Sequence, residues 1–159
     1  MSNSETDRAA IVETCTRMAW LADQRRWEEL VEQFTDDVAV DYTSLNGGAP
    51  VRVRGRDLVA GWRAGLSGFD ATQHLVSNHL VAIDGDTAVV TAAFQATHVL
   101  PNQRGGPIWR IGGDYRYELV RADGWRISAV TMTMTWSEGN FDLLALAASA
   151  GESDAGAVR

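Results

Sequence analysis

The sequence predicts a single α+β domain in which helices pack against one face of a strongly curved, mostly antiparallel sheet. Apolar residues recur at helical spacing over much of the first 66 residues, and from residue 73 onward they alternate with polar residues. Two short turn signals, Asp84-Gly85-Asp86 and Ala122-Asp123-Gly124, separate the alternating stretches as tight hairpins do. Helices followed by a meander of strands are typical of the α+β class.

Three helices are expected before residue 70. The first runs from about Thr6 to Gln24, and its apolar face carries Ile11, Cys15, Met18 and Ala22. A shorter second helix starts at Trp27 and includes Phe34, and the polar cluster Thr35-Asp36-Asp37 ends it. The third begins near Gly55, and its apolar stripe consists of Leu58, Val59, Trp62 and Leu66.

Six strands and a closing helix complete the expected fold. Val38 to Tyr42 and Val51 to Val53 flank the turn sequence Asn46-Gly47-Gly48-Ala49-Pro50 as a hairpin. Four longer strands follow at about residues 73–83, 87–100, 109–121 and 125–136, and Gly112-Gly113 inside one of them marks a bend or bulge. Residues 141–148 form a short apolar helix. We expect one domain over residues 6–149, with disorder in residues 1–5 and 150–159.

Composition excludes several classes of function. A net charge of −7 and a pI near 4.8 argue against a nucleic acid partner, because binding phosphates needs clustered lysine and arginine. Cys15 is the only cysteine, which excludes an internal disulfide and favours a reducing, cytoplasmic setting. The sequence contains no run of 18 apolar residues, so we do not expect it to insert into a membrane. The sequence lacks a zinc motif, a phosphate loop and a nucleophile elbow, so we expect neither metal nor cofactor.

The three histidines, His74, His79 and His98, are the first candidates for chemistry. His74 and His79 are an odd number of residues apart, so an unbroken strand points them to opposite faces, and only a bulge lets both line one pocket. His98 falls on the apolar strand face of Ala92, Phe94 and Ala96. A polar imidazole on such a face needs a hydrogen-bond partner or a functional role. For a single histidine on an apolar strand face, the pattern favours a hydrogen-bonded core residue over a catalytic one.

Asp23 and Tyr42 are further candidates. Asp23 closes the first helix at the edge of its apolar face, where a partly buried carboxylate requires a partner and a helix C-terminus disfavours negative charge. A surface acid or a cap is the structural alternative. Tyr42, at the end of the first strand, can donate its phenol to a ligand or cover a sheet edge with its ring.

The last long strand has an uneven pattern. Met132, Met134 and Trp136 share one face, while three threonines share the other. Two methionines and a tryptophan suit the wall of an adaptable apolar pocket, and ordinary core packing explains them nearly as well.

Several short motifs occur in a distinctive order, namely Ala22-Asp23-Gln24-Arg25-Arg26-Trp27, Val40-Asp41-Tyr42, Thr72-Gln73-His74, His98, Asp123-Gly124-Trp125, and Trp136 before Phe141-Asp142. In this order, over about residues 8 to 146, the chain resembles scytalone dehydratase and its SnoaL-like relatives in the nuclear transport factor two-like superfamily. The resemblance implies a cone-shaped fold of three helices packed in a curved sheet. It also implies a C-terminal helix that closes the cavity over a small cyclic substrate.

The resemblance further implies roles for individual residues. Asp23 matches the family aspartate that orients a histidine, His74 matches that histidine, and His98 matches a second pocket histidine. Tyr42 matches a tyrosine that helps polarise the substrate carbonyl through water. The residues expected to contact the substrate are Tyr115, Met132, Met134, Trp136 and Phe141. An Asp-His pair of the same kind drives elimination of hydrogen chloride in the related lindane dehydrochlorinase.

Three positions depart from the dehydratase pattern. Ala22 stands where the family has a second tyrosine, Gly113 where it has a serine, and Tyr115 where it has an asparagine. The acid-base pair is present while the substrate contacts differ. The fungal pigment substrate of the dehydratase is therefore not assumed for this chain.

Together these residues predict a cofactor-independent lyase that performs a dehydratase-type elimination on a small cyclic or polyketide-like hydroxyketone. Asp23 is expected to hold His74, which removes a carbon-bound proton, while His98 and Tyr42 stabilise the enolate oxygen or assist departure of the leaving group. The alternatives are a SnoaL-like polyketide cyclase or ketosteroid-type isomerase, and a non-catalytic small-molecule-binding domain. Because the outer face of the sheet needs covering and relatives are dimers or trimers, we expect a homodimer or homotrimer.

Overall fold

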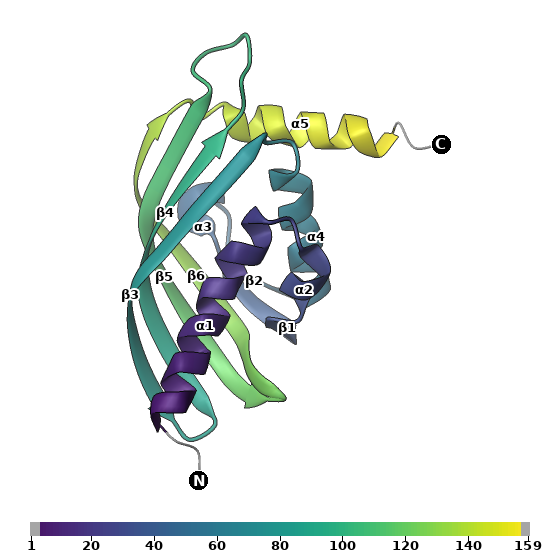
Figure 1. The fold of residues 1–159 in the computed structure, drawn as a ribbon. Coiled ribbons are helices and arrows are strands. Elements are labelled where there is room, and N and C mark those ends of the chain that lie inside the picture. The colour runs from purple at the N-terminus through teal and green to yellow at the C-terminus, as the bar shows by residue number, and fades with distance from the viewer. Residues whose placement is uncertain (1–3, 157–159) are drawn as a thin grey trace.

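The computed structural model describes residues 4–156, with side chains as far as residue 150. It shows one curved, six-stranded sheet wrapped around helices, as expected for the α+β class (Figure 1). The helices are α1 (Ser4–Asp23), α2 (Trp27–Val31), α3 (Thr43–Asn46), α4 (Gly55–Leu66) and α5 (Leu143–Gly156). The strands are β1 (Phe34–Asp41), β2 (Val51–Arg54), β3 (Ala71–Asp84), β4 (Thr87–Val99), β5 (Ile108–Ala122) and β6 (Gly124–Gly139).

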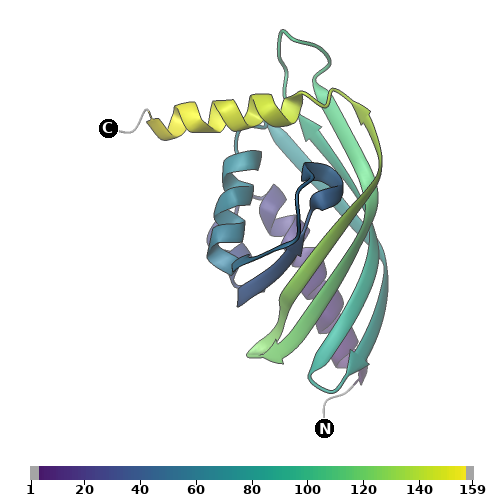
Figure 2. The ribbon, with the colours of Figure 1, turned by 180° about the vertical axis from the view of Figure 1, so that it is seen from behind.

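The sheet has the strand order β2-β1-β6-β5-β4-β3. All neighbouring strands are antiparallel except β1 and β6, which run parallel. The first strand of the chain thus lies beside the last. The four long strands curve around α1 and α4, and α5 lies across one end of the sheet (Figures 1 and 2). The mostly antiparallel sheet and the closing helix agree with the prediction. No helix within residues 4–156 is long and apolar enough to cross a membrane.

Element boundaries differ from the sequence-based expectation at several places. The second helix ends at Val31, because Phe34 and the acidic cluster after it belong to β1. One-turn helix α3 lies where only a turn was expected. At the chain ends, α1 begins at Ser4 and α5 continues to Gly156. The expectations for residues 1–3 and 157–159 lie outside the described residues.

Helix α1 is fastened to the sheet by a carboxylate near each end. Near its start, buried Asp7 accepts two hydrogen bonds from the Arg121 guanidinium and one from the Trp125 indole. At its end, Asp23 accepts hydrogen bonds from Thr72 and from the His74 backbone in β3. Between them the apolar face is buried in the core, with Ile11 and Cys15 fully covered. The helix is thereby fixed along its length against the concave face.

Bulges change which way side chains point in two strands. In β3 the register shifts between Ser77 and Leu80, and Asn78 has a φ of 57°. One extra residue reverses the alternation, so His79 shares the inward face with His74. The bulge that would place both histidines on one face is therefore present. The Nε2 atom of His79 is buried and has no hydrogen-bond partner among the described residues.

The second bulge lies in β6, opposite the paired glycines of β5. Gly112 pairs with Trp136 and Gly113 pairs with Met134, which leaves Thr135 as the extra residue. A Cβ atom on Gly112 would lie 2.3 Å from the indole of Trp136, so that indole covers the outer side of the glycine. The bulge predicted from the two glycines is confirmed. Its consequence, that Trp136 turns away from the interior, was not anticipated.

Candidate active site

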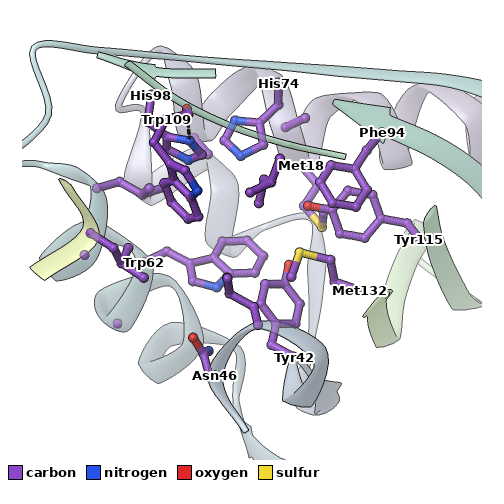
Figure 3. A pocket seen from close by; sticks show the side chains of 18 residues that line it. Met18, Tyr42, Asn46, Trp62, His74, Phe94, His98, Trp109, Tyr115 and Met132 are labelled. Atoms are coloured by element: carbon purple, nitrogen blue, oxygen red, sulfur yellow. Dashed lines mark hydrogen bonds between the residues drawn. The ribbon is translucent and has the colours of Figure 1, made fainter. Parts of the chain in front are cut away.

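A cavity of about 250 Å³ lies between the concave face of the sheet and the helices. Its wall combines side chains from α1, α3, α4, β3, β4, β5, β6 and the start of α5, so that helix α5 closes one end through Leu144. The lining is mainly apolar. The groups in the wall that can form hydrogen bonds come from His74, His98, Tyr42, Tyr115, Asn46 and two tryptophan indoles (Figure 3).

Asp23 and His74 form a close hydrogen-bonded contact at the edge of this cavity. Oδ1 of Asp23 lies 2.7 Å from Nδ1 of His74, and Oδ2 accepts a 2.7 Å hydrogen bond from the His74 backbone N–H. Their side chains are only 9% and 14% exposed. His74 lines the cavity, while Asp23 lies behind it. The structure thus brings together the two residues that the sequence predicted as an acid-base pair.

Thr72 completes the surroundings of the carboxylate. Its hydroxyl donates a 2.9 Å hydrogen bond to Oδ1 of Asp23. Thr72 and His74 are two residues apart in β3 and therefore face the same side of the sheet. Three donors from one strand offset the unfavourable position of Asp23 at the C-terminus of α1, where the helix dipole opposes negative charge.

The geometry fixes which nitrogen of His74 faces the cavity. A carboxylate accepts only, so Nδ1 carries the proton in that contact, and in the neutral ring Nε2 then has the free electron pair. With Nδ1 directed at Asp23, the opposite side of the ring is directed at the cavity. The ring is thereby prepared to accept a proton from a bound molecule.

His98 lies next to His74 in a fully aromatic surrounding. It is 3% exposed, and its ring stacks on Trp109 with 4.6 Å between the ring centroids. The ring centroids of Phe69 and His74 lie 5.0 and 5.7 Å from that of His98. Burial, with a smaller effect of His74, lowers the pKa of His98 to about 4. His98 is therefore neutral at pH 7. One ring nitrogen lies 3.4 Å from the carbonyl oxygen of Trp109.

Two tyrosines contribute phenol groups to the cavity. Tyr115 is buried between the rings of Phe94 at 4.5 Å and Tyr117 at 5.3 Å, and Tyr42 packs on Trp62 at 6.0 Å. Burial raises the pKa of Tyr115 to about 12 and, with the neighbouring tyrosines, raises the pKa of Tyr42 as well. Both phenols therefore keep their protons at neutral pH and can donate to a ligand oxygen.

Not every residue expected to contact the substrate lines the cavity. Met132 does, next to Tyr115 and Tyr42. Met134 is half-buried beyond the cavity, and Trp136 lies on the outer face because of the bulge in β6. Phe141 is half-exposed and contacts the ring of Trp109 edge-on. Of Met132, Met134 and Trp136, which were expected to form one wall, Met132 is the one that lines this cavity.

Several cavity residues were not predicted as site residues. Met18 of α1 and Trp62 of α4 were assigned to apolar helix faces, and the pattern of such a face is the same for a core and for a cavity wall. Ala22, which stands where the family has a second tyrosine, does line the cavity. Asn46 was assigned to a turn. At Gly113, a Cβ atom would lie 1.9 Å from the carbonyl oxygen of Thr133, so backbone crowding explains why no serine stands there.

The described residues contain no cluster of side chains that could bind a metal ion. Residues 4–156 contain no group of three or more histidine, cysteine, aspartate or glutamate side chains that could hold an ion together. Cys15, the one thiol, is buried in the core and absent from the cavity wall. The groups available to a ligand are therefore the His74 imidazole and neutral hydrogen-bonding side chains.

Comparison with known proteins gives a consistent picture. The model of the SnoaL-like domain family matches residues 4–131. An uncharacterized protein of Mycobacterium tuberculosis, Rv2910c, is 31% identical over 125 residues, covering 77% of this chain and 81% of that protein. The crystal structure of the Kfla4162 protein from Kribbella flavida is 35% identical, covers 94% of this chain and 99% of its own, and superposes with a TM-score of 0.82.

Two further solved structures share the fold at lower identity. A scytalone dehydratase-like protein from Novosphingobium aromaticivorans is 23% identical, with a TM-score of 0.68 and coverage of 85% of this chain and 88% of that one. The hexachlorocyclohexane dehydrochlorinase LinA-type3 from Novosphingobium barchaimii is 20% identical, with a TM-score of 0.67 and coverage of 87% and 95%. At these identities the similarity shows the fold.

Proposed function

The chain belongs to the SnoaL-like domain family of the nuclear transport factor two-like superfamily, and on this premise we propose that it is a cofactor-independent lyase. The proposed reaction is a dehydratase-type elimination on a small cyclic hydroxyketone. Asp23 and His74 act as the acid-base pair. The observation that carries the proposal is the 2.7 Å contact between Oδ1 of Asp23 and Nδ1 of His74, behind the wall of an apolar cavity.

The reaction begins with proton transfer to His74. Nε2 accepts a proton from the carbon next to the substrate carbonyl, and the electrons of the C–H bond form an enolate. Asp23 stabilises the imidazolium and keeps the ring orientation. The enolate then expels the hydroxyl group on the neighbouring carbon, which takes the proton back from Nε2. A carbon-carbon double bond and one water molecule result, and His74 returns to its starting state.

The phenols of Tyr42 and Tyr115 are placed to stabilise the enolate oxygen. Both line the cavity, and both keep their protons because burial raises their pKa values. A hydrogen bond to a developing oxyanion is stronger in a water-poor site than in bulk water. His98, neutral at pH 7, contributes a ring that packs beside His74 and limits its movement.

The cavity favours a neutral ligand of one or two rings. A cavity of about 150 Å³ holds a benzene ring, and the present cavity of about 250 Å³ exceeds that volume. Its wall includes neither lysine, arginine nor a carboxylate, so a charged ligand would lose its hydration without gaining a counter-ion. A small cyclic hydroxyketone meets both conditions.

A double-mutant cycle tests the acid-base pair. The probe is 3-hydroxy-1-tetralone, whose loss of water gives 1-naphthol. We expect Asp23→Asn and His74→Ala each to slow turnover by about 10²- to 10⁴-fold, with the double variant no slower than His74→Ala alone. His79→Ala is the matched control, because His79 faces inward on the same strand but does not line the cavity. Multiplicative losses, or full activity of His74→Ala, would contradict the proposal.

The fate of the proton separates elimination from isomerisation. Both reactions begin with abstraction of a proton beside the carbonyl, which appears as exchange of that proton in deuterium oxide. Only elimination lowers the mass of the product by one water. Exchange without loss of water in mass spectrometry would assign the protein to an isomerase or cyclase instead.

We also propose that the chain assembles as a homodimer or homotrimer and acts in the cytoplasm. Leu75, Leu80 and Trp136 expose 58%, 73% and 42% of their surface, and all three lie on the outer side of the sheet. Apolar side chains on an exposed sheet commonly mark an interface. Light scattering after size exclusion is expected to give a multiple of the chain mass, and Leu80→Glu is expected to lower it. A monomer at all concentrations would contradict the assembly.

A further inference from the structure

The cavity has a second polar group of side chains, away from the histidines. Asn46 of α3 and Trp62 of α4 both line it, and Figure 3 shows the nitrogen-bearing edge of the Trp62 indole turned toward Asn46, with His74 and His98 on the other side. Within residues 4–156, neither the Asn46 carboxamide nor the Trp62 indole N–H has a hydrogen-bond partner. Two side-chain donors and one acceptor are thus available to a ligand.

Asn46 is held at the rim by a rigid connection between β1 and β6. The Asp41 carboxylate accepts hydrogen bonds from the N–H and the hydroxyl of Thr43, which starts α3. The Ser44 hydroxyl donates to the Met132 carbonyl and accepts from the Met134 N–H, and so replaces the strand neighbour that β6 lacks beyond β1. The one-turn helix is therefore anchored at both sides, which fixes the position of Asn46.

Trp62 is fixed by its aromatic neighbours. Phe34 contacts the indole edge-on at 5.7 Å, and Tyr42 lies against it at 6.0 Å with an interplanar angle of 30°. The ring consequently keeps one orientation, and its N–H group points to one place. A polar group whose direction is fixed in advance loses little conformational freedom when a ligand binds.

We propose that Asn46 and Trp62 form a second binding subsite that takes a neutral hydroxyl or carbonyl oxygen at the end of the substrate remote from the reacting carbon. The Trp62 N–H donates to this oxygen, and the Asn46 carboxamide donates to it or accepts from it. The apolar middle of the cavity contacts the rings between the two oxygen groups. This subsite rests on the proposed function, because it assumes that the cavity is the substrate site.

The substrate class follows from the two polar ends. It is a neutral cyclic compound with oxygen functions at opposite ends, one beside the His74 imidazole and one beside Asn46. A compound with a single oxygen function leaves either end unsatisfied. Asn46 is exposed and Trp62 is half-buried, so the second oxygen gains a net hydrogen bond of about 1 kcal/mol there, and the compound with two oxygens is preferred.

Calorimetric titration with two naphthalene probes tests the subsite. We expect the protein to bind naphthalene-2,6-diol about five- to tenfold more tightly than 2-naphthol, the effect of one additional hydrogen bond. Asn46→Ala and Trp62→Phe should each reduce this ratio toward one, because each removes a hydrogen-bonding group of the subsite. Trp62→Phe keeps an aromatic ring, although a smaller one, and the effect of its size is shared by both probes. Trp20→Phe is the matched control, since Trp20 is exposed on α1 and does not line the cavity.

The outcomes separate this subsite from the acid-base pair. His74→Ala should leave the preference for the diol intact, so a ratio that depends on Asn46 supports the subsite even if turnover shows that His74 is not the base. An unchanged ratio in both Asn46→Ala and Trp62→Phe would overturn the subsite. Failure of the unaltered protein to bind either naphthol, or equal affinity for the two, would overturn it as well.

Discussion

The hydroxyl of Thr72 donates a 2.9 Å hydrogen bond to the Asp23 oxygen that also contacts the His74 imidazole. This bond and the backbone N–H of His74 occupy both carboxylate oxygens from one strand. The carboxylate cannot rotate away from the imidazole without breaking at least one of them. Thr72 is therefore a positioning residue, which acts on the substrate only through the pair it orients.

Replacing Thr72 by valine tests this role. Valine has nearly the same shape and lacks the hydroxyl, so we expect turnover of 3-hydroxy-1-tetralone to fall about five- to tenfold, the effect of one hydrogen bond of about 1 kcal/mol. Thr72→Ser should restore most of the rate, and the pH-rate profile of Thr72→Val should shift relative to the unaltered protein. Equal rates and profiles for the serine and valine variants would show that the hydroxyl is only structural.

The buried imidazole of His98 predicts how stability depends on pH. Its pKa of about 4 in the folded chain lies below the ordinary 6.5, so between these values the unfolded chain binds more protons. Stability from His98 is complete above pH 6.5 and is lost as the pH falls toward 4. Urea unfolding at pH 7 and pH 4.5 should show a loss from His98 of about 2 kcal/mol.

His98→Gln isolates that contribution, because the carboxylates titrate alike in both proteins. The variant should lose about 2 kcal/mol less on acidification than the unaltered protein. His79, whose pKa burial also lowers, is present in both and cancels in the comparison. An identical pH dependence for the two proteins would mean that His98 is not buried in its neutral form.

Gly68 permits close contact between the end of α4 and α5. A Cβ atom there would lie 1.9 Å from the Ala147 carbonyl oxygen, so Gly68→Ala should push α5 off the cavity and cost about 1 to 3 kcal/mol. Urea unfolding measures the loss of stability, and the calorimetric affinity for 2-naphthol measures the displacement of α5 from the cavity. Gly65→Ala is the stability control, because open space surrounds that position in α4 and alanine favours a helix. Equal stability of the two variants would contradict the contact.

Cys15 offers a test of the packing between α1 and the sheet. It is fully buried, and burial raises the pKa of its thiol from 9.0 to about 12. Ellman's reagent at pH 8 should therefore react at least about a thousandfold more slowly with the folded protein than with the chain in guanidinium, where one thiol per chain reacts. Rapid reaction of the folded protein would show that α1 detaches readily.

The sequence predicts the sheet and most of its helices because apolar periodicity is strong in both halves. It also indicates Asp23 and His74 as candidate site residues. Their contact, however, depends on where the end of α1 meets the start of β3. That meeting point is a tertiary relationship which no local pattern encodes. The family resemblance identified the pair, and the coordinates place the two atoms 2.7 Å apart.

The bulges explain why two side chains point to another face than simple alternation predicts. Alternation with period two assumes an unbroken strand, and a single extra residue exchanges the faces of every later side chain. Thr135 does this to Trp136, and the irregularity at Asn78 does it to His79. Gly112-Gly113 gave a sequence signal for the bulge in β6, whereas Asn78 gave none for the bulge in β3 that a strand pattern would reveal. Asn46 was missed because α3 is too short for helical periodicity to detect.

The parallel pairing of β1 with β6 determines when the cavity can form during synthesis. Phe34 in β1 lies beside Ile127 in β6, so β1, which pairs early with β2, gains its second neighbour only after β6 has been synthesised. The hairpin of β3 and β4 has no such delay, because its partners are adjacent in the chain. A nascent chain stalled before β6 therefore has the His74 strand paired with β4 while the wall that carries Met132 is missing, and we expect ligand binding to begin only after β6 has been synthesised.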